Sequence, residues 1–318
     1  MATERTSQKR TSMLADVAEM YYIEGRDQSA IASKVGVTRS MVSRMLTEAR
    51  SRGIVEIKVI RPIHSNHELE EAIKSRFGIE SVFVVMMEDT KPEKLLVNLG
   101  RAAAEELKKY LRPDLLIGVA WGTAVSATID AVQPMGEQSI KVIQLVGAQG
   151  ARNDEYDGHA LVKRLAEKLG GEGYFINAPY LCQTPEIAQS MRETRGIKET
   201  IDMGKEIQIA LLGVGTTEIE YSSYYLSGLV SGEEIEAIRK NGVVGDIASN
   251  YFNKDGTPYN DDFINRMITI RLEDLTRIPV RIGIAGGSSK VNAIIGALNS
   301  RLVNHLVTDS ITARLILK

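Results

Sequence analysis

The chain has 318 residues, of which 43% are hydrophobic and 25% are charged, and its formal net charge is −2. This composition is typical of a globular protein with room for a small domain and a large one, and no apolar run reaches the roughly 18 residues of a membrane-spanning helix. The charged N-terminus lacks the apolar core of a secretory signal, and the one cysteine, Cys182, has no partner for an internal disulfide. We therefore expect a cytoplasmic protein with no membrane partner.

Charge is distributed unevenly along the chain. Residues 1–62 contain 11 Lys and Arg against 7 Asp and Glu, whereas the rest of the chain contains 28 against 34. Because nucleic-acid affinity rests largely on neutralising phosphates, it is expected in the N-terminal part. Pro62 interrupts the pattern at this point, so we predict a first domain over 1–62 and a second over 63–318.

In chain order, a disordered basic arm is predicted over 1–10, a helix over 12–24, and two helices joined by a tight turn over 27–52. Asp27 is a plausible N-cap, Gly36 supplies the permissive backbone of the turn, and Thr38 caps the second helix. The apolar stripe of this helix has a spacing close to 3.6 residues and comprises Met41, Val42, Met45 and Leu46. The pattern predicts a helix-turn-helix, and a helical hairpin used only for packing is the alternative.

The outward-facing start of the second helix is polar and basic, as the DNA-reading helix of a helix-turn-helix requires. We predict DNA contacts by Thr38, Arg39, Ser40, Ser43 and Arg44. Arg50 and Arg52 are expected near phosphates. The segment IVEIKVI at 54–60 alternates as a strand and would suit the wing of a winged domain, and a connecting helix is expected over 67–77.

From residue 82 onward, apolar runs typical of buried strands alternate with helical segments. The strands are predicted over 82–87, 115–121, 141–147, 173–179, 207–215, 280–286 and 305–309. The helices are predicted over 93–111, 123–132, 158–169, 186–204, 232–240 and 289–300. This alternation indicates an α/β domain with a mostly parallel sheet that is covered on both faces.

Three of the strand ends are rich in glycine and small polar residues. They are Trp121-Gly122-Thr123, Gly213-Val214-Gly215-Thr216-Thr217 and Ala285-Gly286-Gly287-Ser288-Ser289-Lys290. Open α/β sheets bind ligands at the carboxyl ends of their strands, and a helix N-terminus offers unpaired N–H groups and a partial positive charge. With the charge of Lys290, these loops predict an anion site, with phosphate as the favoured anion. A plain turn is the alternative for any single loop, and no Walker A or GxGxxG motif is present, so no cofactor is predicted.

Further side chains are candidates for such a site. Asp246, in VVGDIASNYF, is predicted to bind sugar hydroxyls, and a helix cap or a solvated loop carboxylate is the alternative. Trp121 would either stack on a ligand or pack in the core. Gln144 and Gln149 are weaker candidates for donors to hydroxyls. The four histidines lack metal-ligand spacing and Cys182 lacks an activating neighbour, so neither a metal site nor a catalytic residue is predicted.

Together these residues resemble the SorC family of bacterial transcriptional regulators over nearly the whole chain. The similarity lies in LADVAEMYYIEGRDQSAIASKVGVTRSMVSRMLTEARSRGIVEI near the N-terminus and then in IGVAWGTA, GVG (213–215), VGDI (244–247), RIGIAGGSSKVNAIIGAL and LVTDSITARLIL. The resemblance implies an effector domain of the sugar isomerase and CoA-transferase-like fold. It also implies homo-oligomers, usually tetramers, and regulation by a phosphorylated sugar or a related metabolite.

The residues and the resemblance predict one ligand site, made by Trp121, Gly122, Thr123, Gly213, Gly215, Asp246, Gly286, Gly287 and Lys290. One segment departs from the family's pattern. Some members carry a lysine in the QLxGG segment, where an amine can condense with an aldehyde sugar. This chain has QLVGAQG there, with Val146 in that place and Ala148 for the second glycine, which excludes a Schiff base at that position.

We therefore predict a DNA-binding regulator of carbohydrate metabolism, a dimer or tetramer on operator DNA, whose DNA affinity is set by a phosphorylated sugar or polyol. The alternative is a sugar-phosphate isomerase or deaminase with an appended helix-turn-helix. Acid–base catalysis on a sugar requires two positioned proton-transfer groups, and Asp246 has no convincing partner in the sequence. We expect that the protein is not an enzyme.

Overall fold

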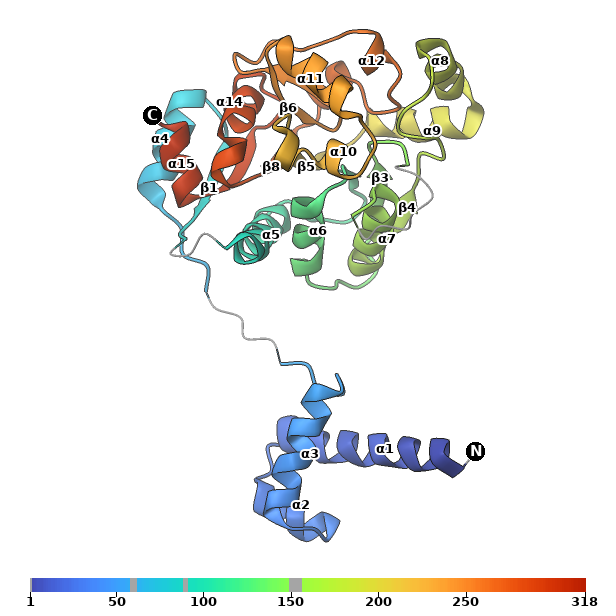
Figure 1. Cartoon of the computed structure of the whole chain (residues 1–318), viewed down its shortest axis with the longest axis vertical. Coiled ribbons are helices and arrows are strands. Elements are labelled where there is room, and N and C mark those ends of the chain that lie inside the picture. The colour runs from blue at the N-terminus through green and yellow to red at the C-terminus, as the bar shows by residue number, and fades with distance from the viewer. Residues whose placement is uncertain (1, 58–61, 88–90, 149–155) are drawn as a thin grey trace. The chain divides into compact units, whose positions relative to one another are not determined.

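The computed structural model describes residues 2–57, 62–87, 91–148 and 156–318. The chain divides into two compact units, Met1–Pro62 and Ile63–Lys318 (Figure 1). In the described part of the chain, no helix combines the length and the apolar character needed to cross a membrane.

The described part of the first unit contains three helices, α1 (Ala2–Tyr22), α2 (Gln28–Val35) and α3 (Arg39–Ser51). The prediction of a disordered arm over 1–10 is wrong, because α1 already begins at Ala2. No glycine or proline interrupts the stretch from Ala2 to Tyr22, and its many charged side chains are compatible with an exposed helix. An ion pair of 2.6 Å between Arg10 and Glu48 links the early part of α1 to α3.

The turn between α2 and α3 forms as its residues predict. The Asp27 carboxylate accepts hydrogen bonds of 2.8 Å from the backbone N–H groups of Ser29 and Ala30. Gly36 ends α2 in the left-handed conformation, with φ of 74°. Thr38 caps α3 by accepting a hydrogen bond of 3.2 Å from the N–H of Met41. The core of this unit comprises buried residues of all three helices, among them Leu14, Val17, Ile31, Val42, Met45, Leu46 and Ala49.

Two predictions for this unit require correction or stay open. Met41 does not belong to the apolar stripe of α3, because its side chain is 41% exposed while the stripe follows positions 42, 45, 46 and 49. Residues 54–57 form no strand, although Ile54 and Val55 pack against the core. The remainder of the predicted wing strand, 58–60, lies outside the described residues, so the wing stays a prediction.

The second unit is built on a twisted parallel sheet with the strand order β1-β9-β8-β5-β2-β3-β4. These strands are β1 (Ser81–Val85), β2 (Leu116–Val119), β3 (Lys141–Gln144), β4 (Glu172–Tyr174), β5 (Ile209–Thr216), β8 (Val280–Ile284) and β9 (His305–Asp309). Along β5, Ile209 and Leu211 join one buried cluster while Ala210 and Leu212 join another. Burial on both faces is the reason why the strands read as continuous apolar runs.

Helices cover both faces of the sheet, as predicted (Figure 1). One face packs against α5 (Pro92–Lys108), α6 (Thr123–Ala131) and α7 (Gly158–Leu169). The other packs against α4 (His67–Phe77), α11 (Gly232–Lys240), α14 (Val291–Asn299) and α15 (Ser310–Ile316). The short helices α10 (Ser223–Leu226), α12 (Asp262–Asn265) and α13 (Leu272–Leu275) lie in the connections.

Three elements differ from the prediction. The segment expected as one helix over 186–204 forms two, α8 (Pro185–Glu193) and α9 (Arg195–Gly204), because Thr194 between them has an extended backbone. The helix expected over 289–300 begins with a 3-10 turn at Ser288–Lys290 and continues as α14. A hairpin of β6 (Val243–Ile247) and β7 (Asn250–Asn253) was not predicted, and β6 pairs antiparallel with β5.

The direction of winding reverses between β2 and β5. The chain moves outward from β2 through β3 to β4, returns to the centre at β5, and then moves outward on the other side through β8 to β9. Between two neighbouring strands whose connections leave in opposite directions, a crevice forms at the carboxyl ends. The topology therefore places a crevice at the carboxyl ends of β2 and β5, where a ligand is expected to bind.

The N-cap of α2 provides a test of the first unit. Replacing Asp27 by Ala leaves the N–H groups of Ser29 and Ala30 without their acceptor, and is expected to lower the free energy of unfolding by about 1 kcal/mol. Urea unfolding followed by circular dichroism measures this change. The control is Ser33→Ala, which removes an exposed hydroxyl bonded only to the Ser29 carbonyl. An equal loss in both variants would contradict the capping role.

Candidate ligand site

The loop after β2 presents the start of α6 to the crevice. Gly122 has a φ of 124°, in the region that favours glycine, and turns the chain from the strand into the helix. Thr123 follows as the first residue of α6 and is exposed. The Gly122 N–H donates to the Tyr156 carbonyl at 3.3 Å, and no side chain among the described residues caps the helix, so the N–H groups from Thr123 onward are available to an anion.

Asp246 lies directly against Gly215 of β5. The two residues are paired in the register of β5 and β6. A side chain at Gly215 would place its Cβ 1.9 Å from Oδ1 of Asp246, so the absence of a side chain makes room for the carboxylate. Asp246 is 4% exposed and stands in a strand, which rules out the alternatives of a helix cap or a solvated loop carboxylate.

The electrostatics of the site centre on this carboxylate. Burial raises the pKa of Asp246 to about 6. Hydrogen bonds from the Ser249 N–H and the Tyr224 side chain, and the positive charge of Lys290, act in the opposite direction and lower this pKa. The Ser249 N–H donates at 3.2 Å. The Lys290 ammonium donates to the Val214 carbonyl at 2.8 Å. Burial lowers the pKa of Lys290, while the charge of Asp246 raises it.

Trp121 packs in the core and also lines the crevice, and its stacking on a ligand stays a prediction. Its side chain is half-buried. The indole N–H donates to the Tyr224 hydroxyl at 3.1 Å, and the two rings meet edge to face with centroids 4.8 Å apart. The Tyr224 hydroxyl in turn shares a hydrogen bond of 2.7 Å with the Ser249 hydroxyl. This chain of contacts holds the indole rigidly in the wall.

The crevice contains a pocket of about 450 Å³, including its open mouth, which we call the WGT pocket. Seven of the nine predicted ligand residues line it, namely Trp121, Gly122, Thr123, Gly213, Gly215, Asp246 and Lys290. Sequence reasoning missed Ser223, Tyr224 and Ala248, which also line it. The tyrosine-rich segment around Tyr224 carries no motif that would have identified it.

Gly286 and Gly287 are not among the residues that line the pocket. The Gly287 N–H donates to the Asp309 carboxylate at 3.1 Å and to the Thr312 hydroxyl at 2.8 Å. A Cβ at Gly286 would stand 2.5 Å from the same carboxylate. These glycines let the backbone approach Asp309, and the Gly287 N–H is already satisfied within the protein.

The weaker candidates also have other partners. The Gln144 amide is buried and bonds to the Val146 carbonyl at 2.6 Å and the Ile176 N–H at 3.2 Å. Gln149 lies outside the described residues.

Cys182 is buried, and this burial raises the pKa of its thiol. Among the described side chains, no group of three His, Cys, Asp or Glu is arranged to hold a metal ion.

In the first unit, the predicted DNA-reading residues lie together on one exposed face of α3. Thr38, Arg39, Ser40, Ser43 and Arg44 are all exposed. The side chains of Arg39 and Arg44 make no hydrogen bond or ion pair with another described residue, whereas Arg52 pairs with Glu48 at 2.8 Å. The unpaired arginines of α3 are therefore available to a partner.

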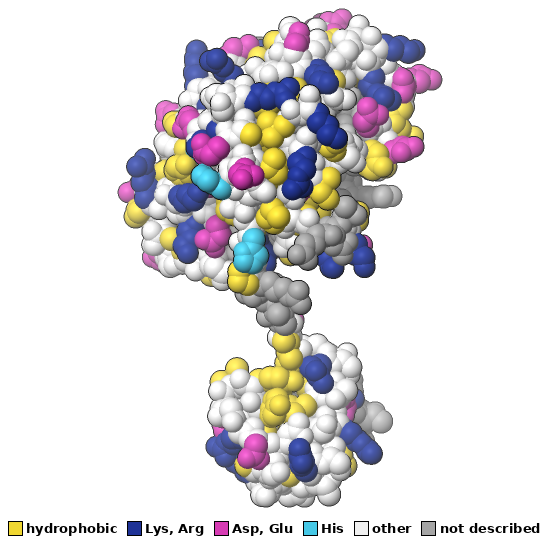
Figure 2. Space-filling model, turned by 90° about the vertical axis from the view of Figure 1, so that its left-hand side faces the viewer, with side chains coloured by type: hydrophobic (Ala, Val, Ile, Leu, Met, Phe, Trp, Pro, Cys, Tyr) yellow, Lys and Arg dark blue, Asp and Glu magenta, His cyan; other side chains and the backbone are white. Residues whose placement is uncertain are grey.

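In the second unit, basic and acidic side chains are interspersed on the face that Figure 2 shows.

The packing of Asp246 on Gly215 can be tested with a matched pair of variants. Gly215→Ala forces the buried carboxylate to move and is expected to lower the free energy of unfolding by roughly 1–3 kcal/mol. Gly213→Ala is the control, because its nearest neighbours, a carbonyl of Trp121 and a methyl of Val125, lie at 3.7 and 3.8 Å. Thermal unfolding compares the two. Similar losses in both variants would contradict the assigned role of Gly215.

Comparison with known proteins agrees with this architecture. A family model described as "Putative sugar-binding domain" matches residues 61–318. The chain is 28% identical to the sorbitol operon regulator of Klebsiella pneumoniae, with 96% of this chain and 98% of that protein covered. It is 29% identical to the deoxyribonucleoside regulator of Bacillus subtilis, with 96% and 97% covered. It is 27% identical to the erythritol catabolism regulatory protein EryD of Brucella abortus, with 96% of each chain covered.

Solved structures give the same result. The full-length sorbitol operon regulator SorC from Klebsiella pneumoniae matches with a TM-score of 0.76 at 26% identity, with 96% of this chain and 98% of that chain covered. A probable sor operon regulator from Shigella flexneri matches with a TM-score of 0.73 at 30% identity, with 80% and 99% covered. These similarities confirm the predicted fold, a helix-turn-helix unit followed by a mostly parallel α/β unit. The chain belongs to the SorC family of transcriptional regulators, which carry this sugar-binding domain, and the relatives it matches are named as regulators.

Proposed function

We propose that the protein binds operator DNA through α3 and releases or engages it in response to a phosphorylated sugar or polyol bound in the WGT pocket. The observation that carries the proposal is the convergence of the α6 N-terminus, the Asp246 carboxylate and the Trp121 ring on one pocket at the winding reversal. The names of the relatives, which refer to sorbitol, deoxyribonucleosides and erythritol, support a sugar or polyol as the effector class.

Each wall of the pocket suits one part of such a ligand. The N–H groups in the first turn of α6, from Thr123 onward, suit the phosphate, because they add hydrogen bonds to the positive end of the α6 dipole. The Asp246 carboxylate accepts hydrogen bonds only and suits the donor hydroxyls of a sugar chain. The indole of Trp121 offers an apolar surface for the carbon backbone. Lys290 adds positive charge beside Asp246.

The DNA contacts are assigned to the exposed start of α3. Arg39 and Arg44 suit guanine edges in the major groove, Ser40 and Ser43 suit bases or phosphates, and Thr38 lies at the helix start nearest the groove. One helix of this kind reads only a few base pairs. We therefore infer a homodimer or tetramer on repeated half-sites.

Control by the effector follows from linkage. A ligand changes DNA affinity only to the extent that it binds the DNA-competent and DNA-incompetent states of the oligomer with different affinity. Contacts to both β5 and β6 give the ligand a means to favour one arrangement of the second unit.

The reader assignment is tested by Arg44→Ala. Loss of a bidentate contact to a base is worth about 1–3 kcal/mol, so operator affinity should fall by about tenfold or more. A gel shift on the DNA upstream of the protein's own gene measures this. Arg195→Ala is the control for charge, because this side chain is 93% exposed and lies on α9 of the second unit. Unchanged binding by Arg44→Ala would refute the assignment.

The effector is tested by thermal shift in the presence of phosphorylated and unphosphorylated sugars and polyols, since a ligand that binds the native state raises the melting temperature. We expect stabilisation by one of the phosphorylated compounds. Stabilisation by free sugars alone would contradict the phosphate assignment.

The pKa of Asp246 predicts how the effector's affinity depends on pH. Its value of about 6 exceeds the ordinary 3.8, so the folded protein holds this proton more tightly, and the group's contribution to stability falls as pH rises between these values. The ionised carboxylate is the form that accepts from hydroxyls, so affinity should rise with pH between about 5 and 7. Calorimetric titrations of the wild type and Asp246→Asn at several pH values test this. A pH dependence that survives in Asp246→Asn would assign the effect to another group.

A further inference from the structure

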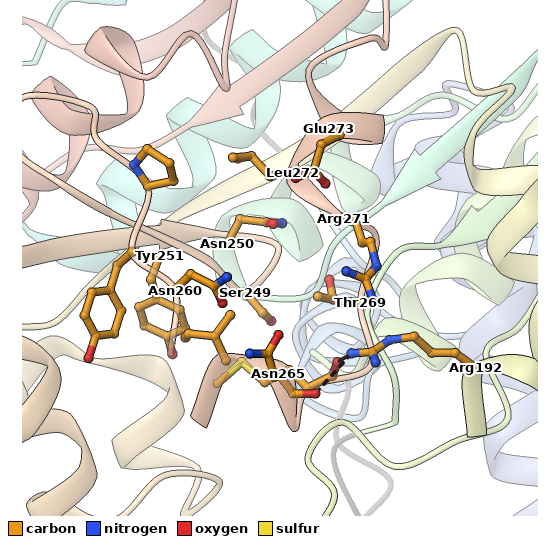
Figure 3. A pocket seen from close by; sticks show the side chains of 14 residues that line it. Arg192, Ser249, Asn250, Tyr251, Asn260, Asn265, Thr269, Arg271, Leu272 and Glu273 are labelled. Carbon is orange, nitrogen blue, oxygen red and sulfur yellow. Dashed lines mark hydrogen bonds between the residues drawn. The ribbon is translucent and has the colours of Figure 1, made fainter. Parts of the chain in front are cut away.

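A second cavity of about 730 Å³, including its open mouth, is lined in part by Ser249 of the β6–β7 turn (Figure 3). It shares no lining residue with the WGT pocket. Its walls come from α8, from β7 and the segment after it, from α12, and from the stretch that leads into α13. The lining residues whose chemistry matters here are Arg192, Arg271, Glu273, Asn250, Asn260 and Asn265.

Two arginines lie close together on one wall of this cavity. Arg192 donates to the backbone carbonyls of Asn265 and Met267, and its Nε is buried without an acceptor among the described residues. Burial and the neighbouring charge of Arg271 lower the pKa of Arg192. No described carboxylate forms an ion pair with either guanidinium. The pair is therefore a local concentration of positive charge that the described protein does not neutralise.

The cavity also presents neutral polar groups. Figure 3 shows the side chains of Asn260 and Asn265 directed toward the same space as the two guanidinium groups. Neither amide has a hydrogen-bond partner among the described residues, and both residues are exposed. The Asn250 amide nitrogen, in contrast, is occupied by three backbone carbonyls. Glu273 is the one acidic side chain among the described lining residues, which leaves the lining with a net positive charge.

We propose that this arginine pocket is a second ligand site, which binds a small organic anion through Arg271 and Arg192 and the hydroxyl groups of that anion through Asn260 and Asn265. Guanidinium groups form paired, charge-assisted hydrogen bonds with the oxygens of a carboxylate or a phosphate, and these bonds are stronger than neutral ones. Unpaired amides both donate to and accept from hydroxyls. The ligand class is thus a hydroxylated carboxylate or phosphate ester. This assignment goes beyond the WGT pocket and does not depend on its ligand.

The experiment compares Arg271→Gln with Arg277→Gln in the full-length protein. Arg271 is exposed and has no partner among the described residues, so its replacement should leave the fold intact. Arg277 lies a few residues further on, is 77% exposed, pairs with Asp274 at 3.7 Å and does not line the cavity. The two variants therefore lose the same charge from the same region. Citrate and inorganic phosphate serve as probes, and isothermal titration calorimetry measures their affinity for each protein.

We expect citrate to bind the wild type and Arg277→Gln with equal affinity. Its affinity for Arg271→Gln should be at least about tenfold lower, because a charge-assisted hydrogen bond is lost. The fluorescence of Trp121, the only tryptophan of the chain, reports the WGT pocket separately. The same pattern with phosphate assigns the site to oxyanions in general, and the pattern with citrate alone assigns it to carboxylates. Equal affinities in all three proteins, equal weakening in both variants, or no binding of either probe at millimolar concentration would overturn the proposal.

Discussion

The site is organised by one close approach, that of the Asp246 carboxylate to the backbone of Gly215. It requires a residue without a side chain on β5 and an antiparallel partner strand, and β6 satisfies the second condition. The carboxylate accepts a hydrogen bond from the Ser249 N–H, which helps to hold the β6–β7 turn. Ala248 and Ser249 have φ values of 46° and 64° there, a conformation that costs free energy for residues other than glycine. A hydrogen bond of 2.6 Å from Thr269 to the Ala248 carbonyl supports the turn from the other side.

The winding of the sheet decides which loops meet. The WGT loop follows β2 and the GVG segment ends β5, and these strands are neighbours although β3 and β4 come between them in the sequence. The connection after β8 adds Lys290 from a third segment. The β6–β7 turn contributes Ala248 to the WGT pocket and Ser249 to the arginine pocket, so one short turn separates the two cavities. A ligand that moves this turn would therefore change the lining of both cavities.

The predictions succeeded where the determining interactions are local. The cap of α2 at Asp27 and the left-handed Gly36 depend on neighbouring residues, and β5 and β8 are visible in the sequence as short apolar runs. They failed where a distant segment decides the outcome. The β6–β7 hairpin was missed because VGDI is short and lacks a clear alternation, and only its pairing with β5 makes it a strand. The sequence around Gly286 and Gly287 is typical of a phosphate loop, whereas in the structure the Gly287 N–H donates to the carboxylate of Asp309 in β9, so the ligand role of these glycines stays a prediction.

The sequence by itself determined the family, the helix-turn-helix, the α/β class and most of the residues of the WGT pocket, because caps, glycine turns and apolar periodicity are properties of short segments. Only the tertiary structure decided how deeply Asp246 is buried, and hence its raised pKa, since desolvation comes from the segments packed around it. It also decided which N–H groups remain free at the strand ends. The nearness of Arg192 and Arg271 has no trace in the sequence, because it arises when the region of α8 and the approach to α13 meet beside the β6–β7 turn.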